Sequence, residues 1–231
     1  MTVFVLVGTG SKYETRDKNG ISHFLEHMFF KGTQRRSTPL LVAEALDQVG
    51  GLYNAFTGED YTGYYAKVDA THFDLALDWV ADIFLHSKLP PKEIQKEKGV
   101  VLEELHMYYD MPSRHLDNLW MQLLYGDQPA GWNIVGRKES ILQLSRQDLQ
   151  AYIKRQYIAL NTVVCIAGNV TQRRAVEKAR QAFAQIPTAN SMVRVQVRDE
   201  QHAPHLLLEW RKTNQTNIAL GVRAYNLSDP K

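Results

Sequence analysis

The pentapeptide His23-Phe24-Leu25-Glu26-His27 carries the side chains best suited to chemistry. If this segment is helical, two histidines four residues apart lie on one face and can bind a single ion. Neutral imidazoles are good zinc ligands, which leaves Glu26 free to take a proton from a zinc-activated water. The order H-x-x-E-H is the inverse of the H-E-x-x-H metalloprotease motif. The alternative is two helix histidines that cap or pack, with Glu26 in solvent.

A catalytic zinc site needs a third protein ligand and an open position for water. Residues 92–109 have the pattern of a long helix that contains Glu93, Glu97, Glu103 and Glu104. Glu97 and Glu104 are two helical turns apart and share a face, whereas Glu103 points about 100° away from Glu104. Helical geometry therefore narrows the third ligand to Glu97 or Glu104 without choosing between them. Without the pentapeptide, these glutamates would be read as a solvated acidic face.

The elements that must position these residues are of two kinds. Apolar spacing and turn residues predict helices at residues 20–30, 38–49, 71–86, 92–109, 115–124, 146–156 and 173–186. Short apolar runs predict strands at residues 1–8, 52–56, 62–68, 162–167, 204–210 and 217–223. Because strands follow one another in pairs as well as alternating with helices, we expect an α+β fold. Its mostly antiparallel sheet would have about six strands, with helices packed on it.

Composition excludes several classes of protein. The chain has 231 residues, with 27 Lys and Arg against 25 Asp and Glu, and this near-balance argues against nucleic acid or an anionic membrane as a partner. One cysteine, Cys165, rules out a thiolate zinc site, and its apolar strand predicts a buried structural thiol. Residues 1–8 lack the basic start of a signal peptide, and no apolar run reaches the roughly 18 residues that span a membrane. We therefore expect the cytoplasm or another internal aqueous compartment, such as the mitochondrial matrix.

The wider context of the pentapeptide resembles a known family. Residues 23–33, HFLEHMFFKGT, resemble the signature of the pitrilysin family of zinc metallopeptidases, the inverzincins, in the branch of the mitochondrial processing peptidase β subunit and its bacterial relatives. Further matches follow in order along the chain: GSKYE at 10–14, GIS at 20–22, GGLYNAFT at 50–57, EKGVVLEE at 97–104, GRKESI at 136–141 and AGNV at 167–170. The resemblance covers essentially the whole chain and implies a fold like one half of the processing-peptidase clamshell.

The resemblance also implies a role for each matching residue. His23, His27 and Glu104 would hold one Zn²⁺ per chain, Glu26 would be the general base, and Glu97 would be a supporting carboxylate of the catalytic site. Residues Asn54, Ala55 and Phe56 would form an edge strand to which a peptide substrate adds in extended conformation. The implied activity is that of a zinc metalloendopeptidase acting on peptides or targeting presequences. The alternative is a non-catalytic zinc-binding subunit or scaffold that needs a partner.

The resemblance further suggests how the chain is divided. Residues 1–211 would be the zinc-binding catalytic domain, and residues 212–231 a linker and the first strand of a second homologous domain that is truncated or absent. That second half normally closes over the site and supplies an Arg and a Tyr to the substrate carbonyl, and no segment here matches them. We therefore expect a second homologous half, a homodimer mate or a partner subunit.

Overall fold

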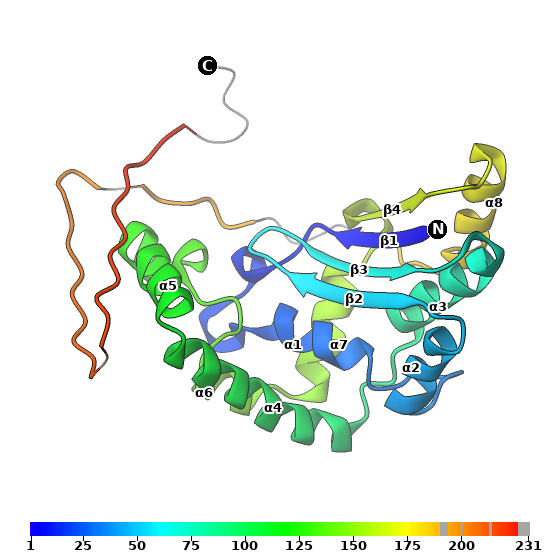
Figure 1. Cartoon of the computed structure of the whole chain (residues 1–231), viewed down its shortest axis with the longest axis horizontal. Helices are drawn as coiled ribbons and strands as arrows, with labels where there is room; N and C mark the ends of the chain where they lie inside the picture. Colours follow the sequence, from blue (N-terminus) through cyan, green and yellow to red (C-terminus); the bar gives the residue numbers. More distant parts are fainter. Residues whose placement is uncertain (190–193, 200, 213, 226–231) are drawn as a thin grey trace.

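The computed structural model describes residues 1–189, 194–199, 201–212 and 214–225 (Figure 1). Four antiparallel strands form one sheet in the order β2-β3-β1-β4. The central strand β1 (Thr2–Val7) pairs with β3 (Thr62–Lys67) on one side and β4 (Thr162–Ala167) on the other. Strand β2 (Leu52–Thr57) pairs with β3 and forms one edge of the sheet. The four strands expected in these regions are thus confirmed.

The helices cover one face of this sheet (Figure 1). They are α1 (Ile21–Phe29), α2 (Pro39–Asp47), α3 (Phe73–His86), α4 (Pro91–Asp110), α5 (Pro112–Tyr125), α6 (Lys138–Gln143), α7 (Arg146–Gln156) and α8 (Gln172–Ala182). Helices α1 and α3 pack directly on the strands, and α4 contacts α1. Helix α1 therefore lies between the sheet and α4.

The core follows from the two periodicities of the sequence. In β1, Val3, Val5 and Val7 are fully buried because alternate side chains of a strand point to the same face. In α3, the side chains of Phe73, Leu77, Val80 and Phe84 are all buried, as their helical spacing predicts. These rows meet between sheet and helices and form one hydrophobic core.

Local signals explain where the helices begin. The Thr38 side chain accepts a hydrogen bond from the Leu41 amide, and Pro39 occupies the first turn of α2. Proline likewise opens α4 and α5. The sequence reasoning missed α6, because six residues are too few for a helical pattern to stand out.

The prediction of strands at residues 204–210 and 217–223 was wrong. The described residues of 204–210 and 217–223 contain no strand, so the sheet has four strands. They lie in extended form beside α5 (Figure 1), where Glu209 contacts His115 at 2.9 Å. Their large apolar side chains are exposed, most of all Trp210 at 92% and Leu220 at 96%. A segment with strand-like composition becomes a strand only when its backbone pairs with a neighbour, and these segments have none in the described part of the chain.

The expected burial of Cys165 was also wrong. Its strand β4 forms the other edge of the sheet, and the side chain of Cys165 is exposed. Exposed residues alternate along β4 with half-buried ones, because only one face of the sheet carries helices.

Among the described residues, no helix is both long enough and apolar enough to cross a membrane.

Candidate metal centre

Helix α1, which carries the pentapeptide, is held at its start by a buried carboxylate. Gly20, before the first turn, has φ of +94° and no capping side chain of its own. Glu14, only 3% exposed, accepts hydrogen bonds from the amides of Gly20 at 2.7 Å and Ser22 at 2.9 Å, and from the Asn19 side chain at 3.0 Å. A carboxylate at a helix N-terminus satisfies free amide groups and interacts favourably with the helix dipole. Glu14 therefore fixes where α1 begins and which way its faces point.

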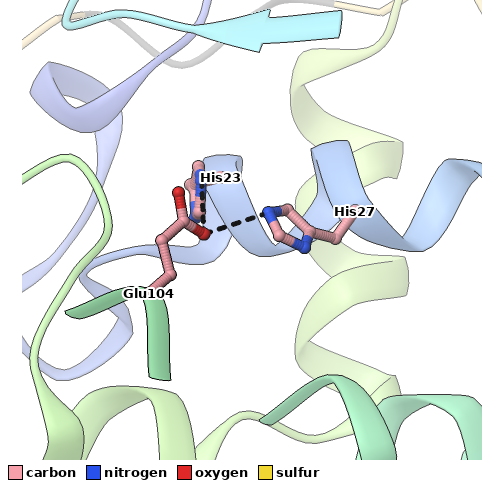
Figure 2. A group of neighbouring side chains, drawn as sticks. All are labelled: His23, His27 and Glu104. Carbon is pink, nitrogen blue, oxygen red and sulfur yellow. Dashed lines mark ion pairs between the residues drawn. The ribbon is translucent and has the colours of Figure 1, made fainter. Parts of the chain in front are cut away.

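His23 and His27 both direct Nε2 at one oxygen of Glu104 on α4 (Figure 2). The distances to Glu104 Oε2 are 3.5 Å from His23 and 3.4 Å from His27. One ligand atom from each of the three residues lies within 4.8 Å of the others. The structure thus brings these three predicted ligands together, from two helices that α1–α4 packing holds side by side.

Glu97 lies on the other side of the His27 ring. Its Oε1 is 2.8 Å from His27 Nδ1, and its Oε2 is 2.8 Å from the Lys31 ammonium. Glu97 is 3% exposed and does not belong to the group of three. Metal-binding histidines commonly bond their second ring nitrogen to a carboxylate, which fixes the ring and its tautomer. Glu97 therefore supports His27, while Glu104 faces both Nε2 atoms.

The electrostatics of the group favour a cation. Burial lowers the pKa of the His27 imidazole, but hydrogen bonds and negative charge from Glu104 and Glu97 outweigh it and raise that pKa to about 9. Burial raises the pKa of the Glu104 carboxyl, but hydrogen bonds from His23, His27 and Tyr108 bring it well below its ordinary value. The pKa of Glu97 is likewise lowered, because His27 and Lys31 outweigh its burial. Two ionised carboxylates therefore converge on the imidazole of His27, where either a proton or a metal ion can balance them.

Glu26 lies next to this group without belonging to it. Its Oε2 accepts a hydrogen bond of 2.6 Å from the hydroxyl of Thr57, the last residue of β2. Glu26 also lines a cleft of about 1250 Å³ together with His23, His27 and Glu104. A carboxylate that faces the same cleft as the three ligand groups is placed to exchange protons with a molecule bound there.

The expected substrate strand is β2, at an open edge of the sheet. Ala55 and Phe56 line the cleft, whereas Asn54 does not. The Asn54 side chain instead accepts a hydrogen bond of 2.9 Å from the amide of Ala55. This amide is therefore not bonded to β3 and belongs to the free edge, where Asn54 satisfies it. The strand has an amide available to an added peptide, once Asn54 releases it.

The remainder of the cleft comes from segments that sequence reasoning did not assign to the site. Its apolar wall is formed by α4, α5 and the segment after α5, with side chains Val100, Met107, Trp120, Met121, Trp132, Ile134 and Val135. Tyr108 could have been found from spacing, because it follows Glu104 by one helical turn. Thr57 could not, because its contact with Glu26 depends on how α1 packs on the sheet.

Comparison with known proteins adds to this geometry. Residues 1–138 match the family model described as Insulinase (Peptidase family M16). This chain belongs to the M16 peptidase family. Residues 143–231 match a second model of the M16 peptidases, described as the Peptidase M16 inactive domain.

Several M16 relatives resemble the chain over most of its length. It is 37% identical over 225 residues to the uncharacterized zinc protease YmxG of Bacillus subtilis, covering 96% of this chain and 54% of that protein. It is 35% identical over 195 residues to the probable mitochondrial-processing peptidase subunit beta of Arabidopsis thaliana, covering 83% of this chain and 36% of that protein. The chain thus spans about half the length of the bacterial zinc proteases that it matches.

Solved M16 structures share the fold. A protease from Helicobacter pylori superposes with a TM-score of 0.78 at 26% identity, over 86% of this chain and 48% of that one. Pitrilysin superposes with a TM-score of 0.77 at 22% identity, over 87% of this chain and 22% of that one. The M16 architecture is therefore present here, in a chain shorter than these proteins.

Proposed function

We propose that this chain is the zinc-binding, catalytic part of an M16 metalloendopeptidase that hydrolyses peptides or targeting presequences. The observation that carries the proposal is the convergence of His23, His27 and Glu104 beside Glu26 in one open cleft. Two imidazole nitrogens and one carboxylate oxygen are the donor set of a catalytic zinc site, which keeps a further position open. The residues present therefore fit one Zn²⁺ per chain.

When bound, zinc polarises a carbonyl and makes water acidic enough to lose a proton near neutral pH. The chain's own residues do the rest. Glu26 takes the proton from the attacking water and later delivers it to the departing amine, so the C–N bond breaks as the new C–O bond is kept. Glu97, itself paired with Lys31, holds His27 at Nδ1 so that Nε2 stays directed at the ligand position.

The substrate would add to the free edge of β2 as an extended strand. Backbone hydrogen bonds at a sheet edge bind peptides with little regard to sequence, and the adjoining cleft takes side chains. The Ala55 amide is the donor that such a strand would engage, in place of Asn54. Phe56, 39% exposed, lines the cleft beside it.

The last part of the proposal concerns what covers the open side of the cleft. We propose that residues 1–211 form the catalytic domain and residues 212–231 lead into a second one, although residues 213 and 226–231 lie outside the described residues. A second homologous half, a homodimer mate or a partner subunit would then cover the cleft. The matched lengths support this, because the relatives are about twice as long as this chain.

One observation favours the second candidate, a non-catalytic zinc subunit. The family model that matches residues 143–231 is described as an inactive domain. The two candidates differ in what they require of Glu26. This carboxylate faces the cleft but is not one of the three ligand groups, so a peptidase needs it as a base and a scaffold does not need it.

The test combines zinc content with cleavage of a fluorogenic peptide, by the chain alone and with candidate partner subunits. Wild-type protein should bind one zinc and cleave the peptide, and Glu26→Gln should keep the zinc and lose cleavage. Glu93→Gln is the matched control, because Glu93 lies on α4 and pairs with Lys96 at the surface. Zinc binding with no cleavage by any wild-type sample would favour the scaffold, and failure to bind zinc would refute both candidates.

A further inference from the structure

The hydroxyl of Thr57 is the only hydrogen-bond partner of Glu26 in the described part of the chain. At 2.6 Å, this is a short hydrogen bond between a hydroxyl and a carboxyl oxygen. Thr57 is the donor in this bond, and Glu26 Oε2 is the acceptor. The bond joins the end of the expected substrate strand to the residue that would move the proton.

Thr57 itself lies next to a hydrogen-bonded turn. It pairs in register with Thr62 of β3, and the hydroxyl of Thr62 donates to the carbonyl of Thr9 at 2.9 Å. Between the two strands, the amide of Gly58 donates to the carbonyl of Tyr61 at 2.9 Å. The end of β2 is thus fixed both within the hairpin and to the segment that follows β1.

That segment closes tightly over the turn. The amide of Ser11 donates to the Gly58 carbonyl at 3.3 Å, and the amide of Lys12 donates to the Glu59 carbonyl at 3.0 Å. A Cβ at Gly10 would lie only 2.1 Å from the Gly58 carbonyl oxygen, so only glycine fits. Gly10 has extended backbone, and close approach rather than its φ angle is what requires glycine here.

We propose that Thr57 is a positioning residue for Glu26, a role that rests on the proposed hydrolytic function. By occupying Oε2, the hydroxyl holds the carboxylate in one rotamer and leaves Oε1 as the oxygen that takes the proton. A long side chain such as glutamate has several rotamers, and fixing one in advance reduces the cost of reaching the reactive geometry. Thr57 is the last residue of the strand to which the substrate would add. Its bond to Glu26 therefore fixes the position of the base relative to the bound peptide.

The test compares Thr57→Val, which keeps the shape without the donor, with Thr57→Ser, which keeps the donor. In the valine variant we expect zinc content and KM to stay at the wild-type level, because in the described part of the chain the Thr57 hydroxyl bonds to Glu26 and to none of the three ligand residues. We expect kcat to fall about 10- to 100-fold, the usual effect of removing a group that orients a catalytic side chain. The serine variant should restore kcat.

Thr162→Val is the matched control. Thr162 is the first residue of β4 in the same sheet, and within the described part of the chain its hydroxyl makes one hydrogen bond, to the Ile158 carbonyl at 2.8 Å. It lies outside the cleft, and its variant should keep the wild-type kcat.

Crystal structures of the same proteins supply a readout that does not depend on activity. Glu26 should occupy one position in the wild-type and serine proteins and leave it in the valine variant. An unmoved Glu26 in the valine variant, or a wild-type kcat there, would overturn the role of Thr57. If the wild-type chain neither binds zinc nor cleaves peptide, the proposed function fails, and the position of Glu26 still decides whether Thr57 holds it.

Discussion

Replacing Glu97 by glutamine should change zinc affinity in a way that depends on pH. The substitution keeps the shape and an oxygen that can accept the His27 Nδ1–H bond, now 2.8 Å long, but removes a negative charge. Two effects then oppose each other. Loss of a charged supporting group typically weakens metal binding about 10- to 100-fold. Loss of the same charge also lowers the affinity of His27 for the proton that competes with the metal.

The magnitudes decide which effect dominates at each pH. In the zinc-free protein the pKa of His27 is raised to about 9, against burial, by hydrogen bonds and charge from Glu104 and Glu97. Zinc must displace this proton below pH 9, so wild-type affinity should fall about 50-fold between pH 9 and pH 7, or by about 2.3 kcal/mol. The variant carries less of this penalty, because one of the two charges that raise the pKa has gone.

The gap between wild type and Glu97→Gln should therefore be about 10- to 100-fold at pH 9 and smaller at pH 7. The assay is competition for zinc with a chelator of known affinity at both pH values, with Glu93→Gln as the control on the same helix. Equal affinities at pH 9, or a gap that does not change with pH, would refute the assignment of Glu97 to His27.

Two further predictions concern stability. Asp82 is fully buried and accepts hydrogen bonds from Thr33, Arg35 and Arg36, so Asp82→Asn should lower the free energy of unfolding by about 3 kcal/mol, as removal of one member of a buried ion pair does. Burial raises the pKa of Asp82, but these donors lower it on balance. The stabilisation by ionised Asp82 is therefore complete above its ordinary pKa of 3.8 and is lost as the pH falls through its lower pKa in the folded protein. Urea unfolding at pH 7 and pH 3 can check this loss. Gly10→Ala should destabilise the chain by about 1–3 kcal/mol, because its Cβ would collide with the Gly58 carbonyl, and should move Thr57 in a crystal structure. Gly99→Ala is the control, because Gly99 lies inside α4 with nothing within 4 Å of the added Cβ. This variant should gain about 0.5–1 kcal/mol in the free energy of unfolding. In thermal unfolding, a loss of stability in Gly99→Ala, or no loss in Gly10→Ala, would contradict the packing argument.

Most helices and all four strands of the sheet could be predicted from sequence because their signals are local. The cap at Thr38, the proline at the start of α4 and the alternation of Val3, Val5 and Val7 each act within a few residues. The two final strands could not be predicted in the same way. Residues 204–210 and 217–223 have the apolar composition of strands. A strand also needs a neighbouring strand to pair with its backbone, and composition does not show whether one is there.

In the candidate site too, local spacing could be predicted from the sequence, but the packing between elements could not. Spacing along α1 alone brought His23 and His27 to one face, and spacing along α4 reduced the third ligand to two glutamates. Spacing could not choose between them, because Glu97 and Glu104 share a helix face and both contact His27. Only the packing of α4 against α1 decided that Glu104 meets the two Nε2 atoms while Glu97 meets Nδ1.

The sequence by itself thus determined the types and the spacing of the candidate ligand residues within single helices, which are short-range properties of the chain. The tertiary structure decided the direction in which each group points and the neighbours that hold it there. The bond from Thr57 to Glu26 spans 31 residues, and that from Glu97 to His27 spans 70. Such contacts exist only because a sheet, a helix and a second helix pack in one order, and no local pattern in the sequence encodes that order.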